Sequence, residues 1–318
     1  MIGAASKSAA ESSNNLIAQF EEDSLIRGLT AETTRRYISA LKIFNSYLEE
    51  TGRDILEVNR DTLKSFINYL RADREVSQRT IETYFAAMAS FYGYLEYERY
   101  IDKNPVIEVR KRYLRKYKDN DDGQVRQLIS VEEMGKLINS TVDVRDRAII
   151  TLLAKTGIRR NELIKLDIDD IDWVDQSIRL KPTAKRTNRT VFFDDEAAIT
   201  LHRWVRASQE TRKKFKTKAL FVSNKGGRLN RNGVYMAVTV PAEKIGLHRP
   251  DSNRMEDHFS PHCCRHWFTT HLRRAGMSRE FIQELRGDVR REAIDIYDHI
   301  DKKELRESYL AHIPQLGI

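Results

Sequence analysis

The chain has 318 residues, of which 40% are hydrophobic and 32% are charged. It can therefore bury a sizeable core, is long enough for two domains, and is neither a disordered nor a collagen-like chain. Lys and Arg outnumber Asp and Glu by 55 to 47, which gives a formal charge of +8. That balance favours a polyanionic partner, with nucleic acid ahead of an anionic membrane.

No apolar run approaches the roughly 20 residues that span a bilayer, and the N-terminus lacks the basic and then apolar pattern of a signal peptide. The only cysteines, Cys263 and Cys264, are adjacent, which is unsuited to a disulfide framework and typical of a reducing compartment. We therefore expect a soluble, cytoplasmic protein with no membrane partner.

The N-terminal third is predicted to be helical. Residues 1–13 are small and polar and are expected to form a disordered leader. Over residues 14–104, apolar side chains recur at spacings of three and four after the cap residues Thr30 and Ser77, which predicts a domain of four or five helices. The two clearest sets are Tyr37, Leu41, Phe44 and Leu48, and Ile81, Tyr84, Met88, Phe91 and Leu95.

Residues 105–129 are predicted to be a linker, because the apolar periodicity stops and the composition becomes basic and then acidic. Two interpretations of the basic part stay open: a solvated charge run, or a strap along a phosphate backbone that makes these side chains DNA-binding residues. The basic residues are Arg110, Lys111, Arg112, Arg115, Lys116 and Lys118.

Residues 130–318 are predicted to form a second, catalytic domain. Ser130 and Glu133 form a capping box, and a helix from about Val144 ends at Gly157. Strand-like pieces at 171–174, 177–181 and 189–193 fit an antiparallel meander, and later segments are mainly helical, including one helix that starts at Ser260 with Pro261 at its first position. The expected fold class is mainly α with a small antiparallel β-meander.

The segment that begins the helix after Ser260 carries reactive side chains. At helical spacing His262, Arg265 and His266 share one face, whereas the adjacent cysteines point elsewhere. His262 and His266 also stand at the spacing of a zinc pair, but the HExxH glutamate and a second Cys/His pair are missing from the sequence, so we expect no metal.

A second arginine site follows Gly157, where one helix gives way to another and Arg159 can be aimed into a cleft beside Glu162. Taken alone, such an Arg–Glu pair is more often a surface salt bridge. Two arginines that converge on a phosphodiester would bind its non-bridging oxygens and stabilise a pentacoordinate transition state. Tyr297 is the candidate nucleophile, and Lys185 or Lys181 is the candidate acid for the leaving 5′-oxygen.

These segments, in this order, resemble the tyrosine recombinase or phage-type integrase family, Xer-like members included. TGIRRNEL resembles the first arginine box, AKRTNRTVFF the hairpin lysine segment, SPHCCRHWFTTHLRRAG the HxxRH box and IDIYDHI the nucleophile segment. Residues 15–100 also resemble the helical core-binding domain that precedes the catalytic domain in this family. The resemblance implies a site-specific DNA recombinase.

Carried over residue by residue, the resemblance implies that Tyr297 forms a 3′-phosphotyrosyl link while Arg159 and Arg265 clamp the phosphate. His262 would assist proton transfer or bond the phosphate, with Lys185 ranked ahead of Lys181 as the acid. His266 and Glu162 would support these side chains. It also implies double-stranded DNA as substrate, a tetramer on paired sites during exchange, and no cofactor, because the phosphotyrosyl bond retains the energy of the broken bond.

One position departs from the family pattern. In LRGD the chain has Asp288 where the family usually has histidine or tryptophan, and an ionised carboxylate cannot donate a hydrogen bond to a phosphate. Asp288 is expected either to face a cation such as Arg286 or Arg290, which we favour, or to accept the phenolic proton of Tyr297. The open alternatives for the whole protein are a type IB topoisomerase-like enzyme that nicks and closes DNA, and a catalytically impaired DNA-binding regulator.

The last helix also leaves a choice open. Asp301 is predicted to cap a helix with an apolar stripe, whose members are Leu305, Tyr309, Leu310 and Ile313. This helix can complete the core of its own domain or dock on a neighbouring protomer, as it often does in the family.

Overall fold

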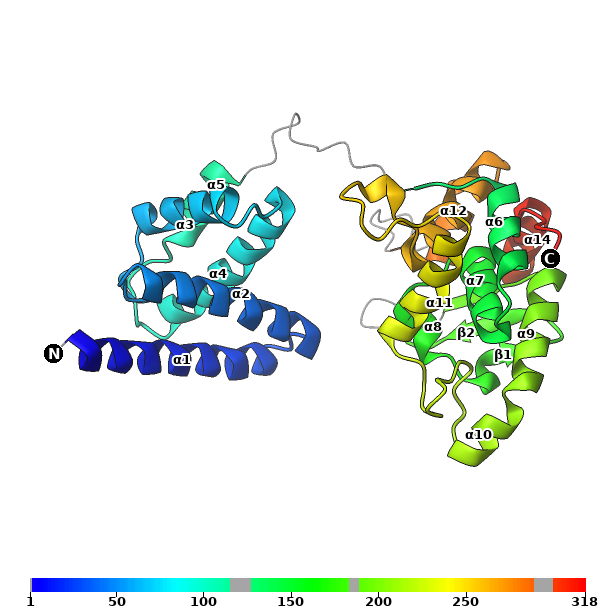
Figure 1. The fold of residues 1–318 in the computed structure, drawn as a ribbon, viewed down its shortest axis with the longest axis horizontal. Coiled ribbons are helices and arrows are strands. Elements are labelled where there is room, and N and C mark those ends of the chain that lie inside the picture. Colours follow the sequence, from blue (N-terminus) through cyan, green and yellow to red (C-terminus); the bar gives the residue numbers. More distant parts are fainter. Residues whose placement is uncertain (1, 115–126, 183–188, 289–299) are drawn as a thin grey trace. The chain divides into compact units, whose positions relative to one another are not determined.

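The computed structural model describes residues 2–114, 127–182, 189–288 and 300–318, with the backbone alone for residues 2–12. Lys185 and Tyr297, like Arg115, Lys116, Lys118 and Arg290, lie outside the described residues. The chain forms two compact units, Met1–Asp122 and Gly123–Ile318 (Figure 1).

The first unit is helical, as predicted. Thr30 and Ser77 cap two of its helices, because their side-chain oxygens accept from the backbone N–H groups of Thr33 and Thr80. Its helices are α1 (Ile2–Ile26), α2 (Ala31–Glu50), α3 (Arg60–Ala72), α4 (Gln78–Tyr97) and α5 (Val106–Tyr113). Buried aromatic rings fill the space between them, among them Phe20, Phe44, Phe66, Phe85 and Phe91.

Both expected irregular segments of this region contain a helix. Helix α1 begins at Ile2, where a disordered leader over residues 1–13 was expected. The alanines of this segment favour a helix that continues into the buried anchors Leu16 and Phe20. Helix α5 lies within residues 105–129, where an irregular linker was expected.

Helix α5 is held by a short apolar stripe. Asn104 accepts the N–H of Val106 at 3.0 Å, and Val106, Val109 and Leu114 are buried in the same core as α3 and α4. A stripe of so few apolar residues among charges gives a weak periodic signal, which is why the sequence predicted a linker. The last turn of α5 carries Arg110, Lys111 and Arg112, which complement the negative end of the helix dipole.

The second unit is mainly helical and contains one small sheet. Strands β1 (Ile171–Asp172), β2 (Ser177–Leu180) and β3 (Arg189–Phe192) pair antiparallel in the order β1-β2-β3, which confirms the predicted meander. Its helices are α6 (Val131–Ser140), α7 (Val144–Thr156), α8 (Arg160–Lys165), α9 (Asp195–Ala207), α10 (Gln209–Phe215), α11 (Arg231–Lys244), α12 (Pro261–Arg274), α13 (Arg279–Arg286) and α14 (Lys302–His312).

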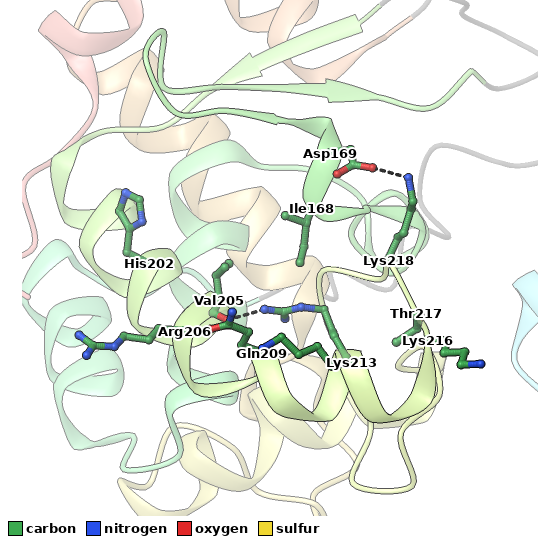
Figure 2. A pocket seen from close by; sticks show the side chains of 11 residues that line it. Ile168, Asp169, His202, Val205, Arg206, Gln209, Lys213, Lys216, Thr217 and Lys218 are labelled. Carbon is green, nitrogen blue, oxygen red and sulfur yellow. Dashed lines mark hydrogen bonds and ion pairs between the residues drawn. The ribbon is translucent and has the colours of Figure 1, made fainter.

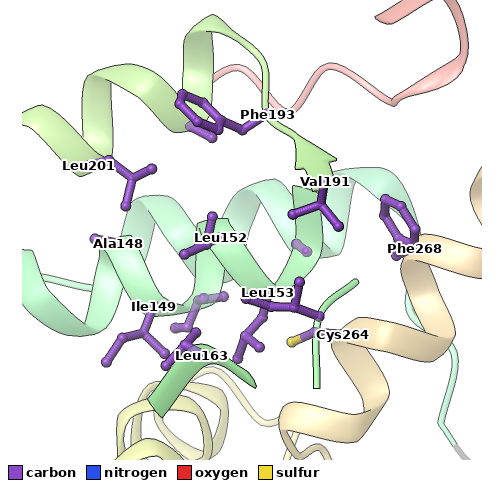
Figure 3. Close-up of a cluster of buried hydrophobic side chains, with 14 of the residues drawn as sticks. Ala148, Ile149, Leu152, Leu153, Leu163, Val191, Phe193, Leu201, Cys264 and Phe268 are labelled. Atoms are coloured by element: carbon purple, nitrogen blue, oxygen red, sulfur yellow. The ribbon is translucent and has the colours of Figure 1, made fainter. Parts of the chain in front are cut away.

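Helix α7 runs through the core of this unit. Its residues from Ala148 to Thr156 are all buried, so the helix is apolar on almost every side. Figure 3 shows Leu153 of α7 between Val191 of β3 and Cys264 of α12. As predicted, the capping box at Ser130 begins α6, and Gly157 ends α7 in a left-handed conformation with φ of 59°.

The C-terminal segment completes the core of its own unit. Tyr309 of α14 is buried and donates to the carbonyl of Lys155 at 2.8 Å. The ammonium of Lys155, itself fully buried, donates to Asp194 at 2.6 Å, to Glu196 at 2.5 Å and to the carbonyl of Pro314 at 2.7 Å. The same Glu196 accepts the backbone N–H groups of the last residues, Leu316, Gly317 and Ile318.

Within the described residues, no helix has the length and apolar character needed to cross a membrane.

Candidate active site

The turn after α7 requires glycine and places Arg159. A Cβ on Gly157 would lie 2.3 Å from Cδ1 of Phe268, so a larger residue cannot fit against α12. The chain then leaves α7 and starts α8 within three residues, with Arg159 at the position before the first helical residue. The guanidinium of Arg159 is 46% exposed and therefore accessible to a ligand.

Arg159 reaches the end of α13. Its Nη1 donates to the carbonyl oxygen of Arg286 at 3.0 Å, and its Nη2 lies 3.3 Å from Oδ1 of Asp288. Glu162 holds the backbone of Arg159, because one of its carboxylate oxygens accepts the backbone N–H of Arg159 at 2.6 Å. Glu162 is thus hydrogen-bonded to Arg159, one of the residues that it is predicted to support.

Arg265 reaches the same two acceptors from α12. Its Nη2 donates to the carbonyl oxygen of Arg286 at 2.8 Å and lies 3.3 Å from Oδ1 of Asp288, while Nη1 donates to the carbonyl of Gly157. Its side chain is only 7% exposed. The two arginine segments, more than a hundred residues apart in the sequence, thus meet at one point.

The two arginines line one cleft of about 460 Å³, with His262 beside them. Cys263 and Cys264 are buried in the core, which confirms that the face carrying His262 and Arg265 turns away from the cysteines. Helix α11 adds two residues that the sequence did not single out, Arg231 and Tyr235. Their only signal was their place near the start of a helix, which does not distinguish a cleft wall from a solvated face. His266 lies half-buried one turn beyond His262.

The cleft carries an excess of positive charge. Burial, together with the charges of Arg159, Arg286 and Arg189, lowers the pKa of Arg265 to about 9, whereas the charge of Asp288 acts in the opposite direction. Guanidinium groups that crowd one another in this way are stabilised by an anion between them. Such an arrangement has the charge suited to an oxyanion ligand.

Arg189 is a member of this cluster that the sequence did not identify. It lies on β3, and its guanidinium pairs with both carboxylate oxygens of Glu162, at 2.7 and 3.2 Å. The sequence contained one signal for the burial of Arg189: in a strand, alternate residues share a face, which places Arg189 on the same face as the apolar Val191.

Of the two candidate acids, Lys181 is described and Lys185 is not. The ammonium of Lys181 pairs with Asp167 and lies 3.8 Å from Asp170. Asp167 is also paired with Arg228. The ammonium of Lys181 therefore lies beside two carboxylates just after β2. Among the residues that the structure describes, its ion pairs are with Asp167 and Asp170 and not with the groups around Arg159 and Arg265.

Asp288 faces cations, and one of them is Arg286, which the sequence suggested as a possible partner. Besides Arg159 and Arg265, its carboxylate contacts Arg286, with Oδ2 3.0 Å from Nε. The other expectation involves Tyr297, which lies outside the described residues.

A second cavity, of about 830 Å³, lies against α9 and α10 (Figure 2). Two of its cations have local partners: Lys218 pairs with Asp169 at 2.7 Å, and Arg212 donates to the carbonyl of Val205 and to Ser208. Across the described ranges, His, Cys, Asp and Glu form no group of three or more able to hold a metal ion. The arginine cleft is therefore the better candidate active site.

Comparison with known proteins agrees with this geometry. A model of the phage integrase family matches residues 121–304, and a model of the phage integrase N-terminal SAM-like domain matches residues 16–102. Tyrosine recombinase XerC of Oceanobacillus iheyensis is 30% identical over 295 residues, which cover 89% of this chain and 90% of that protein. Tyrosine recombinase XerD of Listeria innocua is 26% identical over 314 residues, which cover 95% and 99%.

Solved structures share the fold. A lambda integrase (75–356) dimer bound to a COC′ core site aligns over 91% of this chain and 98% of that chain, with a TM-score of 0.66 and 16% identity. The Tn1549 transposon integrase in complex with a circular intermediate DNA aligns over 92% and 97%, with a TM-score of 0.67 and 17% identity.

The fold and the family match together define an enzyme that breaks and rejoins DNA strands. The chain belongs to the phage integrase family, the tyrosine recombinases, and resembles its Xer members. It is a site-specific DNA recombinase, and these findings favour that function over a topoisomerase-like enzyme or an impaired regulator.

Proposed function

We propose that the recombinase cuts DNA by attack of Tyr297 on a scissile phosphate held between Arg159 and Arg265. One observation carries this proposal: the Nη2 atoms of both arginines lie 3.3 Å from the same carboxylate oxygen. An anionic oxygen at that place contacts both guanidinium groups, so a phosphate oxygen there would have its charge offset from two sides.

The bond changes balance without an external energy source. The phenolic oxygen of Tyr297 forms a bond to phosphorus and gives up its proton to His262 or to solvent, while the bond from phosphorus to the 5′-oxygen breaks, which leaves a 3′-phosphotyrosyl link. Lys185 supplies a proton to the leaving 5′-oxygen, and His262, which lines the cleft, assists the proton transfer or bonds the phosphate. A 5′-hydroxyl of the partner strand then attacks the phosphotyrosine and regenerates Tyr297.

The substrate in this proposal is double-stranded DNA at specific sites, and exchange takes place in a tetramer on paired sites. The lambda integrase tetramer bound to a Holliday junction, a structural neighbour with a TM-score of 0.66, supports this assembly. Arg110, Lys111 and Arg112 of α5 are proposed to contact DNA phosphates, together with Arg115, Lys116 and Lys118. The reaction serves integration, excision or dimer resolution in the cytoplasm.

The test is a covalent adduct on a nicked substrate from which the cut fragment diffuses away. DNA from either side of the gene, searched for short inverted repeats or a tRNA-gene junction, supplies the candidate site. We expect the full-length protein to form an adduct that survives SDS, and Tyr297→Phe to form none. Tyr97→Phe, which removes the hydroxyl of a tyrosine that is 80% exposed, is the matched control and should react normally.

An adduct that persists in the Tyr297→Phe variant would refute the nucleophile. Relaxation of any supercoiled plasmid without recombinant products would instead support the topoisomerase-like alternative. Tight binding without cleavage of the cognate site would support the regulator.

A further inference from the structure

Asp288 lies where the two arginines of the cleft meet. Its Oδ1 atom is 3.3 Å from Nη2 of Arg159 and 3.3 Å from Nη2 of Arg265, and its Oδ2 atom is 3.0 Å from Nε of Arg286. A single carboxylate therefore faces guanidinium groups from three separate segments of the chain.

Two different groups of the same loop hold the arginines. The backbone carbonyl of Arg286 accepts from Arg159 at 3.0 Å and from Arg265 at 2.8 Å. The carboxylate of Asp288 lies 3.3 Å from both arginines. This distance is longer than the roughly 2.7–2.9 Å of a usual charge-assisted N–H···O bond. The carbonyl thus sets the position of the arginines, and the carboxylate is the weaker ligand and the easier one to replace.

We propose that Asp288 is an internal anion that occupies the phosphate position of the free enzyme, so that the DNA phosphate has to displace it. The inference rests on the role proposed above for Arg159 and Arg265 as phosphate ligands. The two N–H groups of Nη2 of Arg265 already have acceptors, the carbonyl of Arg286 and Oδ1 of Asp288, so a phosphate oxygen that binds this nitrogen has to take the place of Oδ1. An ionised carboxylate also has no proton to donate to the phosphate, so the two anions repel each other.

The surroundings allow such a displacement. The side chain of Asp288 is 31% exposed and has solvent into which it can move. In the free enzyme its charge offsets part of the repulsion between Arg265 and the neighbouring arginines, although the pKa of Arg265 still falls to about 9. The carboxylate therefore reduces the repulsion between the arginines, which the carbonyl of Arg286 holds in place, until another anion replaces it.

The competition makes the cleft selective. An isolated oxyanion has only the arginine contacts with which to replace Asp288, whereas a duplex at its own site gains contacts elsewhere on the protein. Binding energy from these remote contacts is then used to expose the arginines to the phosphate. Asp288 therefore acts through the two arginines: it lowers their affinity for a free oxyanion.

Inorganic sulfate is a probe that requires no knowledge of the DNA site. Its affinity is measured on the full-length protein from the rise in melting temperature with sulfate, at constant ionic strength held with chloride. We expect Asp288→Asn, which keeps the shape and removes the charge, to bind sulfate at least tenfold more tightly. Asp288→Glu should bind it as weakly as the unaltered protein, and replacing Arg265 with Lys in the Asp288→Asn protein should abolish the gain.

Asp169→Asn is the matched control, because it removes one carboxylate beside Lys218 in the second cavity and changes the net charge equally. An equal gain in this control, or no gain in Asp288→Asn, would overturn the proposal. Asp288→Ser is the second neutral variant if circular dichroism shows that Asn disturbs the fold. The sulfate titration does not involve Tyr297, so failure of the nucleophile assignment and failure of this inference are separate results.

Discussion

Glu162 and Arg189 form a bidentate ion pair next to Arg159, with Nη1 of Arg189 2.7 Å from Oε1 of Glu162 and Nη2 3.2 Å from Oε2. The pair links β3 to α8, because Arg189 lies on β3 and Glu162 on α8. Glu162 also accepts the backbone N–H of Arg159. Strand β3 and Arg159 are therefore held by one carboxylate.

Removing that carboxylate should destabilise the second unit. Glu162→Ala removes a carboxylate that pairs with the buried guanidinium of Arg189, for which we expect a loss of about 3–5 kcal/mol in the free energy of unfolding, together with slower adduct formation. Urea unfolding followed by tryptophan fluorescence measures the loss, because the chain's three tryptophans all lie in residues 123–318. Glu210→Ala is the control, since its pair with Lys213 is exposed and should be worth no more than about 1 kcal/mol. Equal losses would contradict the expected role of the buried pair.

Gly287 is required at the end of α13 by two independent constraints. Its φ is +64°, and a Cβ there would lie 2.3 Å from Nη1 of Arg189. Gly287→Ala should therefore cost the roughly 1–2 kcal/mol of a left-handed alanine and a further loss from displacing Arg189. The control is Gly28→Ala, which has a φ of +80° with no atom within 4 Å and should show the backbone cost alone.

The comparison needs one readout for each unit, because Gly28 lies in the first unit. Hydrogen exchange of α2 and of α13 provides it, and adduct formation should fall only in the Gly287 variant. A Gly287→Ala protein with full activity would show that the loop 286–288 does not need to hold the arginines in this geometry.

The C-terminal segment should detach at acid pH. Burial raises the pKa of Glu196, but the hydrogen bonds from Lys155, Leu316 and Ile318 outweigh burial, and the net pKa is lowered from 4.5. A lowered carboxyl pKa stabilises the folded state above the ordinary value, and this contribution is lost as the pH falls below about 4.5 through the native pKa. The protection factors of the amides of residues 316–318, which are corrected for the intrinsic pH dependence of exchange, should therefore fall below that pH, and Glu196→Gln should remove this fall. Protection that still varies with pH in Glu196→Gln would contradict the assignment.

The basic end of α5 should contribute to the salt dependence of DNA binding. Replacing Arg110, Lys111 and Arg112 with Ala preserves helix propensity. It should reduce the slope of log K against log salt by up to about 0.9 for each DNA phosphate that these side chains neutralise. Lys213, Lys214 and Lys216, near the second cavity, form the control set, and their replacement with Ala should leave the slope unchanged. Equal changes in the two triple variants would indicate an effect of net charge alone.

Local signals in the sequence were sufficient for most elements and for the family. A cap such as Ser130, a left-handed glycine such as Gly157 and the alternation of β3 act within one turn or one strand, so they can be seen without the fold. The arginine, histidine and tyrosine motifs likewise lie in short continuous segments. The leader and the linker were the exceptions, since α1 and α5 are anchored by a few apolar residues whose value depends on the helices they contact.

Only the tertiary structure decided which groups meet. The shared acceptor of Arg159 and Arg265, the burial of Arg189 against Glu162 and the pairing of Lys181 with Asp167 each join segments that are distant in the sequence. The same holds for Asp288, whose type was known from the sequence but whose position between the two arginines was not. The physical reason is that such contacts arise from the packing of α7, α8, α12 and α13 into one core, and the hydrophobic pattern of each helix specifies a buried face but not the partner that covers it.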